Sequence, residues 1–411
     1  MKKAAVVIIG LMTVGVIALA VVLVPKMACL TTLIPTTTTN STQVTTTPVT
    51  EARLSAVLTS ALGRVEILKP GGSWTSAAIG AKLEKGDTIR TGDSAIATVT
   101  FFDGSTIDLK FATEIKVVDL QQQADQKTIS LSQQVGQTVS RVTQLIDPAS
   151  RYDVETPAAF AAVRGSEMFV SVEKDGLTLV GNIEGDIRAI AANQEVIIPE
   201  GMHCIIFPGE APGKPRAGAN PIMYRTPVMI DPQSDLFGQG GNAVTGAGYL
   251  DIVRSEVYVI LTSLTEGELT LRMQLASALP DAQITPSRLI EWDFLTDLDR
   301  NPDTGMKWPL VANDMGYDFL IRLGLQGGKY QSTMLTVSSN TWQPVEYRIE
   351  GNVVEIYLKI SDLIPSVGGL ITGPGDLYWM VATMLYNPTD ADNQPSVIDK
   401  APNEGHYSLM S

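Results

Sequence analysis

The stretch from Ala97 to Leu109 reads ATVTFFDGSTIDL and holds the clearest structural signal in the chain. Hydrophobic and polar side chains alternate on both sides of Asp103-Gly104, a dipeptide that favours the tight turn of a β-hairpin. Other short runs, such as Val65–Ile67 and the one that opens at Gly86-Asp87, are bounded by glycines in the same way. We therefore expect a mostly antiparallel β domain.

One segment of this region has a different spacing. Hydrophobic residues recur at intervals of three and four between Val135 and Ile146, and Asp147-Pro148 follows them directly. This period is typical of an amphipathic helix, and proline ends such helices. The sequence thus predicts one short helix within the β domain.

Two blocks of residues 52–208 resemble the FecR domain, the extracytoplasmic module named after the iron-dicitrate regulator. The first block contains Gly63-Arg64-Val65, Gly86-Asp87 and Phe102-Asp103-Gly104-Ser105, and the second runs from Tyr152 to Pro157 and from Ala161 to Ser166. The iron-dicitrate type carries an anti-sigma segment before its membrane helix, whereas only residues 1–3 precede the hydrophobic run here. The resemblance therefore implies the fold and not the regulatory mechanism.

Arg164 lies between two small or hydrophobic residues in the second block. A charged side chain close to a β core needs a partner, and Asp153 and Glu155 are the nearest candidates. We expect either this structural ion pair or a direct contact between Arg164 and a ligand.

The N-terminus predicts a single-pass membrane protein. Residues 4–25 carry no charge and are long enough, as a helix, to span roughly 30 Å of hydrocarbon. Lys2 and Lys3 precede this run, so residues 1–3 should stay inside and the rest should be extracytoplasmic. Cleavage as a signal peptide and lipidation at Cys29 are the alternatives. Residues 26–51 are rich in threonine, which indicates a glycosylated stalk or a bare flexible spacer.

The remainder of the chain predicts a linker and a second β domain. Residues 209–248 contain repeated prolines and end near a run of glycines, a composition typical of an extended spacer. Residues 249–411 contain short apolar runs separated by turns, which suggests a jelly-roll β-sandwich. This part resembles secreted sandwich domains related to family-9 carbohydrate-binding modules and DOMON domains. The resemblance rests on Trp292-Asp293-Phe294 and on the acidic stretch that follows it.

That acidic stretch is a candidate metal site. Asp297, Asp299, Asn301 and Asp303 alternate along the chain, and oxygen ligands at such spacing can converge on Ca²⁺. The sequence does not fit an EF-hand, because Pro302 stands where that loop requires glycine. The alternative is a solvated acidic turn.

Exposed aromatic rings of the second domain could stack on sugars, while rings at strand spacing more often belong to the core. The candidates for ligand contact in the two domains are Arg164, Trp292, Trp308, Trp342 and Trp379.

Composition narrows the function classes. A net charge of −14 opposes contact with phosphate backbones, so no nucleic-acid partner is expected. The chain has only two histidines, and His203 adjoins Cys204 on a strand, where neighbours point to opposite faces. We therefore expect no enzyme but a membrane-anchored surface module that binds envelope glycan or protein. The alternative is a ligand sensor that signals through a partner membrane protein.

Overall fold

The computed structural model describes residues 54–238, 242–263, 266–283, 289–309, 311–367, 378–386, 395–402 and 407–408. Within these residues, no helix combines the length and hydrophobicity that a membrane span requires. The predicted anchor (residues 4–25) and stalk (residues 26–51) lie outside the described residues.

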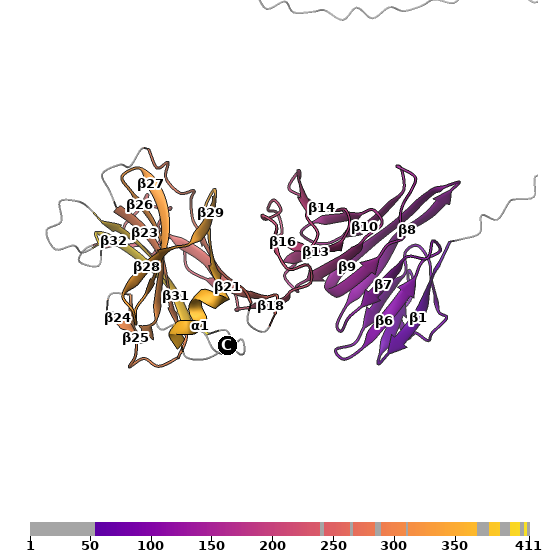
Figure 1. Cartoon of the computed structure of the whole chain (residues 1–411), viewed down its shortest axis with the longest axis horizontal. Coiled ribbons are helices and arrows are strands. Elements are labelled where there is room, and N and C mark those ends of the chain that lie inside the picture. Colours follow the sequence, from indigo (N-terminus) through magenta and orange to yellow (C-terminus); the bar gives the residue numbers. More distant parts are fainter. Residues whose placement is uncertain are drawn as a thin grey trace, which may run out of the picture. The chain divides into compact units, whose positions relative to one another are not determined.

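The first domain consists of two sheets that share one long strand, β9 (Gln126–Arg141) (Figure 1). The remaining strands of the first sheet are β1 (Ala56–Leu62), β4 (Lys82–Leu83), β6 (Ile96–Thr100), β7 (Thr106–Leu109), β12 (Glu167–Val172), β13 (Thr178–Glu184), β16 (Met202–Ile206) and β17 (Arg216–Ala217). Those of the second sheet are β2 (Val65–Leu68), β3 (Trp74–Ser76), β5 (Thr88–Thr91), β8 (Glu114–Gln123), β10 (Arg151–Glu155), β11 (Phe160–Val163), β14 (Ile187–Ala191) and β15 (Gln194–Ile198).

The hairpin predicted at Asp103-Gly104 is confirmed. Strands β6 and β7 pair antiparallel from Thr100 opposite Thr106 onward. The carboxylate of Asp103 accepts hydrogen bonds from the backbone N–H (2.9 Å) and the hydroxyl (2.8 Å) of Ser105. This is the local bonding by which aspartate stabilises turns.

The helix predicted between Val135 and Ile146 is wrong, because residues 126–141 form β9. Residues four apart share a face in a strand as well as in a helix, so the spacing from Val135 to Val139 fits both structures. Strand pairing makes this segment extended and not helical. Strand β9 forms backbone hydrogen bonds with β8 and β10 in one sheet and then with β7 and β12 in the other. The change of sheet occurs around Gly136, whose φ is +92°.

A single hydrophobic core lies between the two sheets of this domain. It is formed by alternate residues of the strands, which point inward from both layers. Its buried members include Leu58, Val99, Leu109 and Val170 of the first sheet and Ile67, Ile89, Ile115, Leu131 and Val154 of the second.

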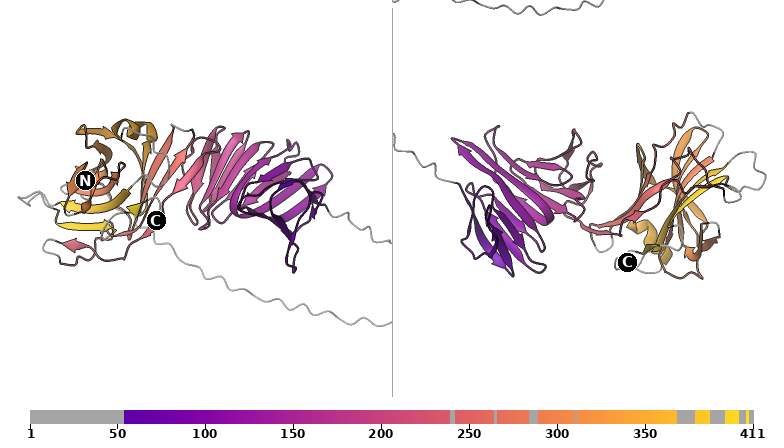
Figure 2. Two further views of the ribbon diagram at one scale, coloured as in Figure 1. Left: turned by 90° about the horizontal axis from the view of Figure 1, so that it is seen from below. Right: turned by 180° about the vertical axis from the view of Figure 1, so that it is seen from behind.

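The second domain is a sandwich of two antiparallel sheets (Figure 2). One sheet contains β18 (Ile222–Arg225), β19 (Met229–Ile230), β21 (Ile252–Leu261), β22 (Gly267–Leu275), β29 (Glu346–Glu350) and β30 (Val353–Lys359). The other contains β20 (Phe237–Gly238), β23 (Leu289–Asp297), β26 (Phe319–Gln326), β27 (Lys329–Thr336), β28 (Thr341–Pro344), β31 (Tyr378–Tyr386), β32 (Val397–Ala401) and β33 (Tyr407–Ser408). A helix that the sequence analysis did not anticipate, α1 (Ile360–Val367), follows β30 directly.

The strands of the sandwich bury two hydrophobic clusters. The main core lies between the sheets and contains Leu271, Ile356, Trp292 and Ile321. A smaller cluster covers the opposite face of β23, where the hairpin β24 (Met306–Trp308) and β25 (Ala312–Tyr317) contributes Met315. The all-β class expected for both domains is confirmed.

Residues 209–248 are more than the expected spacer, because they form four short strands that pair with strands of the two domains. Strand β17 pairs with β16 of the first domain, while β18 and β19 pair with β21 and β20 pairs with β32. The chain therefore passes from one domain to the next between Ala217 and Ile222. The proline-rich composition predicts an extended spacer, but backbone pairing with neighbouring strands places much of this segment in the sheets.

Buried ion pairs cover the face of β21 and β22 that points away from the sandwich core. Arg272 is the centre of this network: its guanidinium pairs with Glu210, lies 3.8 Å from Glu355 and 4.0 Å from Glu256, and stacks 3.6 Å from the centroid of the Phe207 ring. Phe207 and Glu210 follow β16 in the chain, so the network joins the end of the first domain to the second.

Candidate functional site

The acidic loop after β23 is organised by its own side chains. Asp299 Oδ1 accepts hydrogen bonds from the backbone N–H of Asn301 (2.9 Å) and the hydroxyl of Thr304 (2.9 Å). Asn301 Oδ1 in turn accepts from the backbone N–H of Asp303 (3.1 Å). Asn301 therefore stabilises the turn, and Asp303 is not among the acidic side chains that converge here.

Asp318, which the spacing of the acidic loop did not predict, joins Asp297 and Asp299 in this cluster. Thr296 of β23 pairs with Phe319 of β26, which brings Asp318 beside Asp297. Asp297, Asp299 and Asp318 each contribute a carboxylate oxygen to a cluster whose oxygens lie within 4.8 Å of one another. The sequence signal for Asp318 was its position before a strand, but only the pairing of β23 with β26 reveals the contact.

Burial dominates the electrostatics of this cluster. Asp297 is only 1% exposed, and its Oδ1 accepts a hydrogen bond from the backbone N–H of Arg300 (2.6 Å). Burial, followed by the charges of Asp318 and Asp299, raises the pKa of Asp297 to about 7. Burial also raises the pKa of Asp318.

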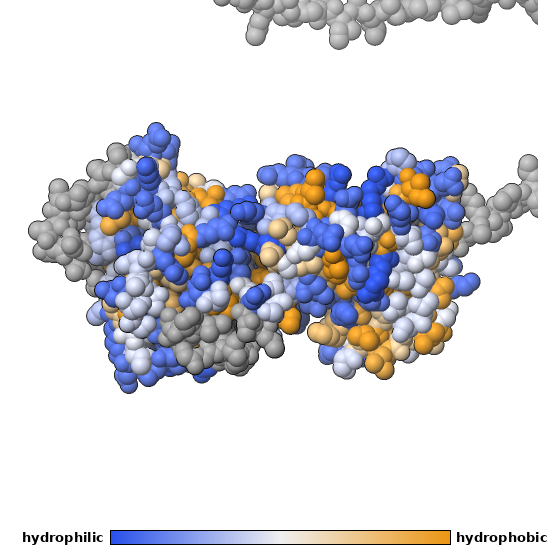
Figure 3. All heavy atoms as spheres, in the orientation of Figure 1, coloured by the Kyte–Doolittle hydropathy of each residue, from blue (hydrophilic) through white to orange (hydrophobic). Residues whose placement is uncertain are grey.

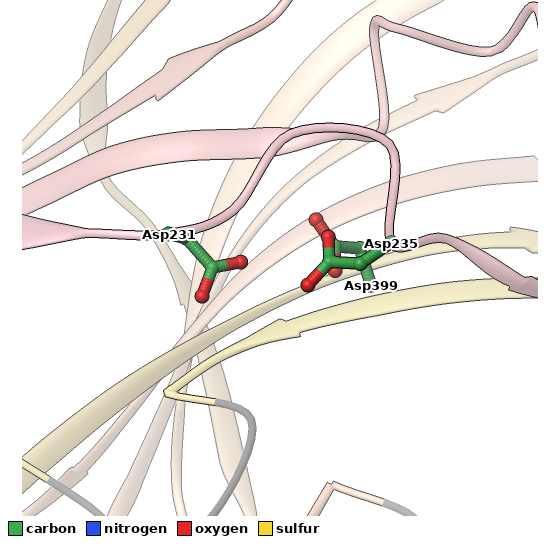
Figure 4. A group of neighbouring side chains, drawn as sticks. All are labelled: Asp231, Asp235 and Asp399. Atoms are coloured by element: carbon green, nitrogen blue, oxygen red, sulfur yellow. The ribbon is translucent and has the colours of Figure 1, made fainter.

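A second acidic cluster joins parts of the chain that are far apart in sequence. Figure 4 shows Asp231 and Asp235, from the segment after β19, facing Asp399 of β32. Asp399 accepts hydrogen bonds from the backbone N–H groups of Ile252 (2.6 Å) and Lys400 (2.9 Å). Burial and the neighbouring aspartates raise the pKa of Asp399 to about 7. No local spacing relates the members of this cluster, so the sequence did not predict it.

Two of the aromatic candidates are wrong. Trp292 and Trp379 are 0% exposed and lie in the sandwich core, where Trp292 Nε1 donates to the carbonyl of Tyr249 (2.8 Å). No sugar can stack on rings in this position. Trp308 is half-buried and Trp342 is 49% exposed, so these two stay predictions as ligand contacts.

Behind Trp342 lies a buried charge cluster on β23 and β26. Arg322 forms a bidentate pair with Asp293 (2.8 Å for both bonds) and also pairs with Glu291 (2.7 Å). The guanidinium carbon lies 5.9 Å from the Trp342 ring centroid. Burial, and then the charge of Asp293, raises the pKa of Glu291 to about 7.

Replacing Glu291 by glutamine should flatten the dependence of stability on pH. Because the pKa of Glu291 is raised on folding, the folded state holds a proton that the unfolded state releases between about pH 4.5 and pH 7. The stability that goes with protonated Glu291 is fully present below pH 4.5, and it is lost as pH rises through 7. We expect Glu291→Gln to be more stable than the wild type at pH 8 by about 1–3 kcal/mol, with little difference at pH 5.

Urea unfolding of the full chain at both pH values measures this effect. Glu195→Gln is the control, because Glu195 is exposed and pairs only with the exposed Arg188. Equal gains at pH 5 and pH 8 would show that the glutamine acts through packing and not through charge.

In the first domain, Arg164 does not form the predicted ion pair. Its guanidinium is exposed and donates to the carbonyl oxygens of Asp147 (3.3 Å) and Pro148. Asp153 is buried and accepts instead from the hydroxyl of Ser130 (2.8 Å). A ligand contact by Arg164 stays a prediction.

His203 and Cys204 do not form a catalytic pair. Cys204 lies in the core between the two sheets, and burial raises the pKa of its thiol to about 12. His203 is buried outside that core, where its Nδ1 bonds to the carbonyl of Gly218 (2.7 Å). The opposite orientation expected of strand neighbours is confirmed.

A known protein family matches part of the first domain. The profile of the family described as FecR protein matches residues 87–188. Two crystal structures of a candidate anti-sigma factor from Parabacteroides distasonis, at 1.65 and 2.50 Å resolution, are similar to 32% of this chain, with 16% identity and a TM-score of 0.27. The similarity spans 59% of those chains, and at this level it carries no argument about function.

No curated protein matches the sequence. The resemblance of residues 249–411 to family-9 carbohydrate-binding modules and DOMON domains is not confirmed and stays a prediction. The matched segment extends from Asp87 in the first block of the predicted resemblance to Arg188 in β14, and so it includes the shared strand β9. Residues 87–188 of the first domain therefore match the FecR family.

Proposed function

We propose that the protein is a membrane-anchored extracytoplasmic module that binds an envelope protein through its FecR domain. The observation that carries this proposal is a group of exposed apolar side chains, Leu62 (67% exposed), Ile96 (46%) and Phe111 (57%), which we call the strand-end patch. Leu62 and Ile96 are direct partners across β1 and β6, and Phe111 follows the adjacent end of β7.

Apolar surface also gathers over this part of the domain in Figure 3, near the ends of β1 and β6 labelled in Figure 1. Neighbouring exposed hydrophobic side chains on a soluble domain indicate a binding surface. A protein is the favoured occupant, because the net charge of −14 opposes approach to anionic lipid.

Site-specific crosslinking tests the proposal. A benzophenone-bearing phenylalanine analogue at Phe111 should capture a defined envelope protein in cells that produce the full chain. The same analogue at Gln194, an exposed position on β15 of the other sheet, should not capture it. Changing Leu62 and Ile96 together to serine should abolish the adduct from position 111.

The outcome also separates the two function classes. An adduct that persists in the serine variant, or that forms equally from position 194, contradicts the strand-end patch as the binding surface. An adduct with a membrane protein that has a cytoplasmic signalling domain would favour the alternative, a sensor working through a partner.

A further inference from the structure

We propose that Asp297, Asp299 and Asp318 form a binding site for a divalent cation of the Ca²⁺ type. This inference is independent of the strand-end patch, because the site lies in the second domain. It also differs from the set expected from sequence spacing, since Asp318 replaces Asn301 and Asp303.

The first argument is a buried oxygen without a hydrogen bond. Asp297 is almost fully buried, its Oδ1 accepts from the backbone N–H of Arg300, and its Oδ2 has no hydrogen-bond partner. An ionised carboxylate oxygen that has left water without gaining a donor is strongly disfavoured. A cation bound to Oδ2 removes this penalty.

The second argument is the convergence of the three side chains. Oxygens that bind one Ca²⁺ at 2.3–2.6 Å can be at most about 5 Å apart. The ligand oxygens of Asp297, Asp299 and Asp318 lie within 4.8 Å of one another, a spacing that suits one shared ion after small side-chain movements. Two of these side chains are held in place, because Asp318 accepts from the N–H of Leu298 (2.9 Å) and Asp299 from Thr304.

The chemistry of the ligands selects the ion. Three carboxylates without histidine or cysteine form a hard oxygen site, which suits Ca²⁺ rather than Zn²⁺. Asp299 is exposed, so water can reach the ion and complete its coordination. Mg²⁺ should bind less well, because it gives up its own water reluctantly and requires stricter octahedral geometry.

The competing explanation is a proton shared by Asp297 and Asp299. Their side chains are close enough for a carboxyl–carboxylate hydrogen bond, which contributes to the raised pKa of Asp297. A shared proton and a bound cation both relieve the repulsion between the two groups. They differ in their response to Ca²⁺ at constant pH.

Calorimetric titration of CaCl₂ into the chelator-treated full chain at pH 8 distinguishes the two. We expect binding of one Ca²⁺ with a dissociation constant of about 10⁻³ M or tighter, and weaker binding of Mg²⁺. Asp297→Asn and Asp318→Asn should each weaken Ca²⁺ binding roughly tenfold or more. Asp303→Asn is the control: it removes one negative charge from the exposed loop after β23 and should change affinity less than about twofold.

Several outcomes overturn the assignment. Absence of Ca²⁺ binding by the wild type at roughly 10 mM leaves the shared proton as the explanation. Loss of binding in Asp303→Asn with retention in Asp318→Asn supports the sequence-spacing ligands instead. Unchanged binding in all three variants assigns the ion to another cluster. Far-ultraviolet circular dichroism of each variant identifies any that fails to fold, and the two substitutions at 297 and 318 provide independent tests.

Discussion

Replacing Arg272 by methionine is expected to lower the free energy of unfolding by about 1–3 kcal/mol, because Glu210 loses its ion partner while Glu256 and Glu355 each lose one of theirs. The Arg272 side chain is only 4% exposed. Its guanidinium lies among the carboxylates of Glu210, Glu256 and Glu355, and the last two are buried. Methionine keeps much of the volume but removes the one positive charge that, among the described residues, lies beside all three carboxylates.

The effect is measured by urea unfolding of the full chain, followed by circular dichroism. Arg188→Met is the control, because Arg188 and its partner Glu195 are both about half exposed and such surface pairs contribute less than about 1 kcal/mol. Adding Glu210→Gln to the Arg272→Met variant should recover part of the loss, because Arg272 is the one ion partner of Glu210 among the described residues. A loss below about 1 kcal/mol for Arg272→Met would contradict this account of the network.

Because Glu210 lies beyond β16 and Arg272 lies in β22, the same substitution tests how the two domains are coupled. The sequence predicts that residues 52–208 and 249–411 fold separately. If the Arg272 network is the main coupling, the wild type should unfold in one transition and Arg272→Met in two. Two transitions in the wild type would support domains that are independent from the start.

Gly136→Ala is expected to destabilise the first domain by at least about 3 kcal/mol. Gly136 has a φ of +92°, and a Cβ atom there would lie 2.4 Å from the Cα of Thr113. Backbone atoms at Thr113 cannot move away cheaply, since Thr113 Oγ1 also bonds to the backbone N–H and carbonyl of Gln137. The substitution therefore combines an unfavourable backbone conformation with a steric clash at the point where β9 changes sheets.

Gly201→Ala is the matched control for this prediction. Gly201 has a similar φ of +79°, but nothing lies within 4 Å of an added Cβ. It should lose only the conformational term, roughly 1–2 kcal/mol. Thermal unfolding of both variants measures the difference, and equal losses would show that the close approach to Thr113 is unimportant.

The helix predicted between Val135 and Ile146, where the structure has β9, shows why this strand could not be predicted from its own sequence. Val135 and Val139 satisfy a helical repeat and a strand repeat equally well. Four other strands supply the hydrogen bonds that make residues 126–141 extended, and those strands begin as early as Thr106 and as late as Glu167. A local pattern contains no information about partners at such separations.

The residues of the candidate cation site were likewise only partly predictable from the sequence. Asp297 and Asp299 were found by spacing, because both lie at the end of one strand and the start of one loop. Asp318 lies between β25 and β26, and its proximity to Asp297 depends on the register of β23 against β26. Likewise, Trp292 and Trp342 look equivalent in sequence, yet alternation along β23 directs Trp292 into the core.

The sequence by itself determined the β class of both domains, the turn at Asp103-Gly104 and the FecR resemblance of the first domain. These features follow from side-chain alternation and turn chemistry, which act between residues close together in the chain. Only the tertiary structure decided that β9 joins two sheets, that Asp318 completes the acidic cluster and that Arg272 lies among three glutamates. Each of these depends on strand pairing between distant segments, where hydrogen-bond register and burial, and not local propensity, set which side chains meet.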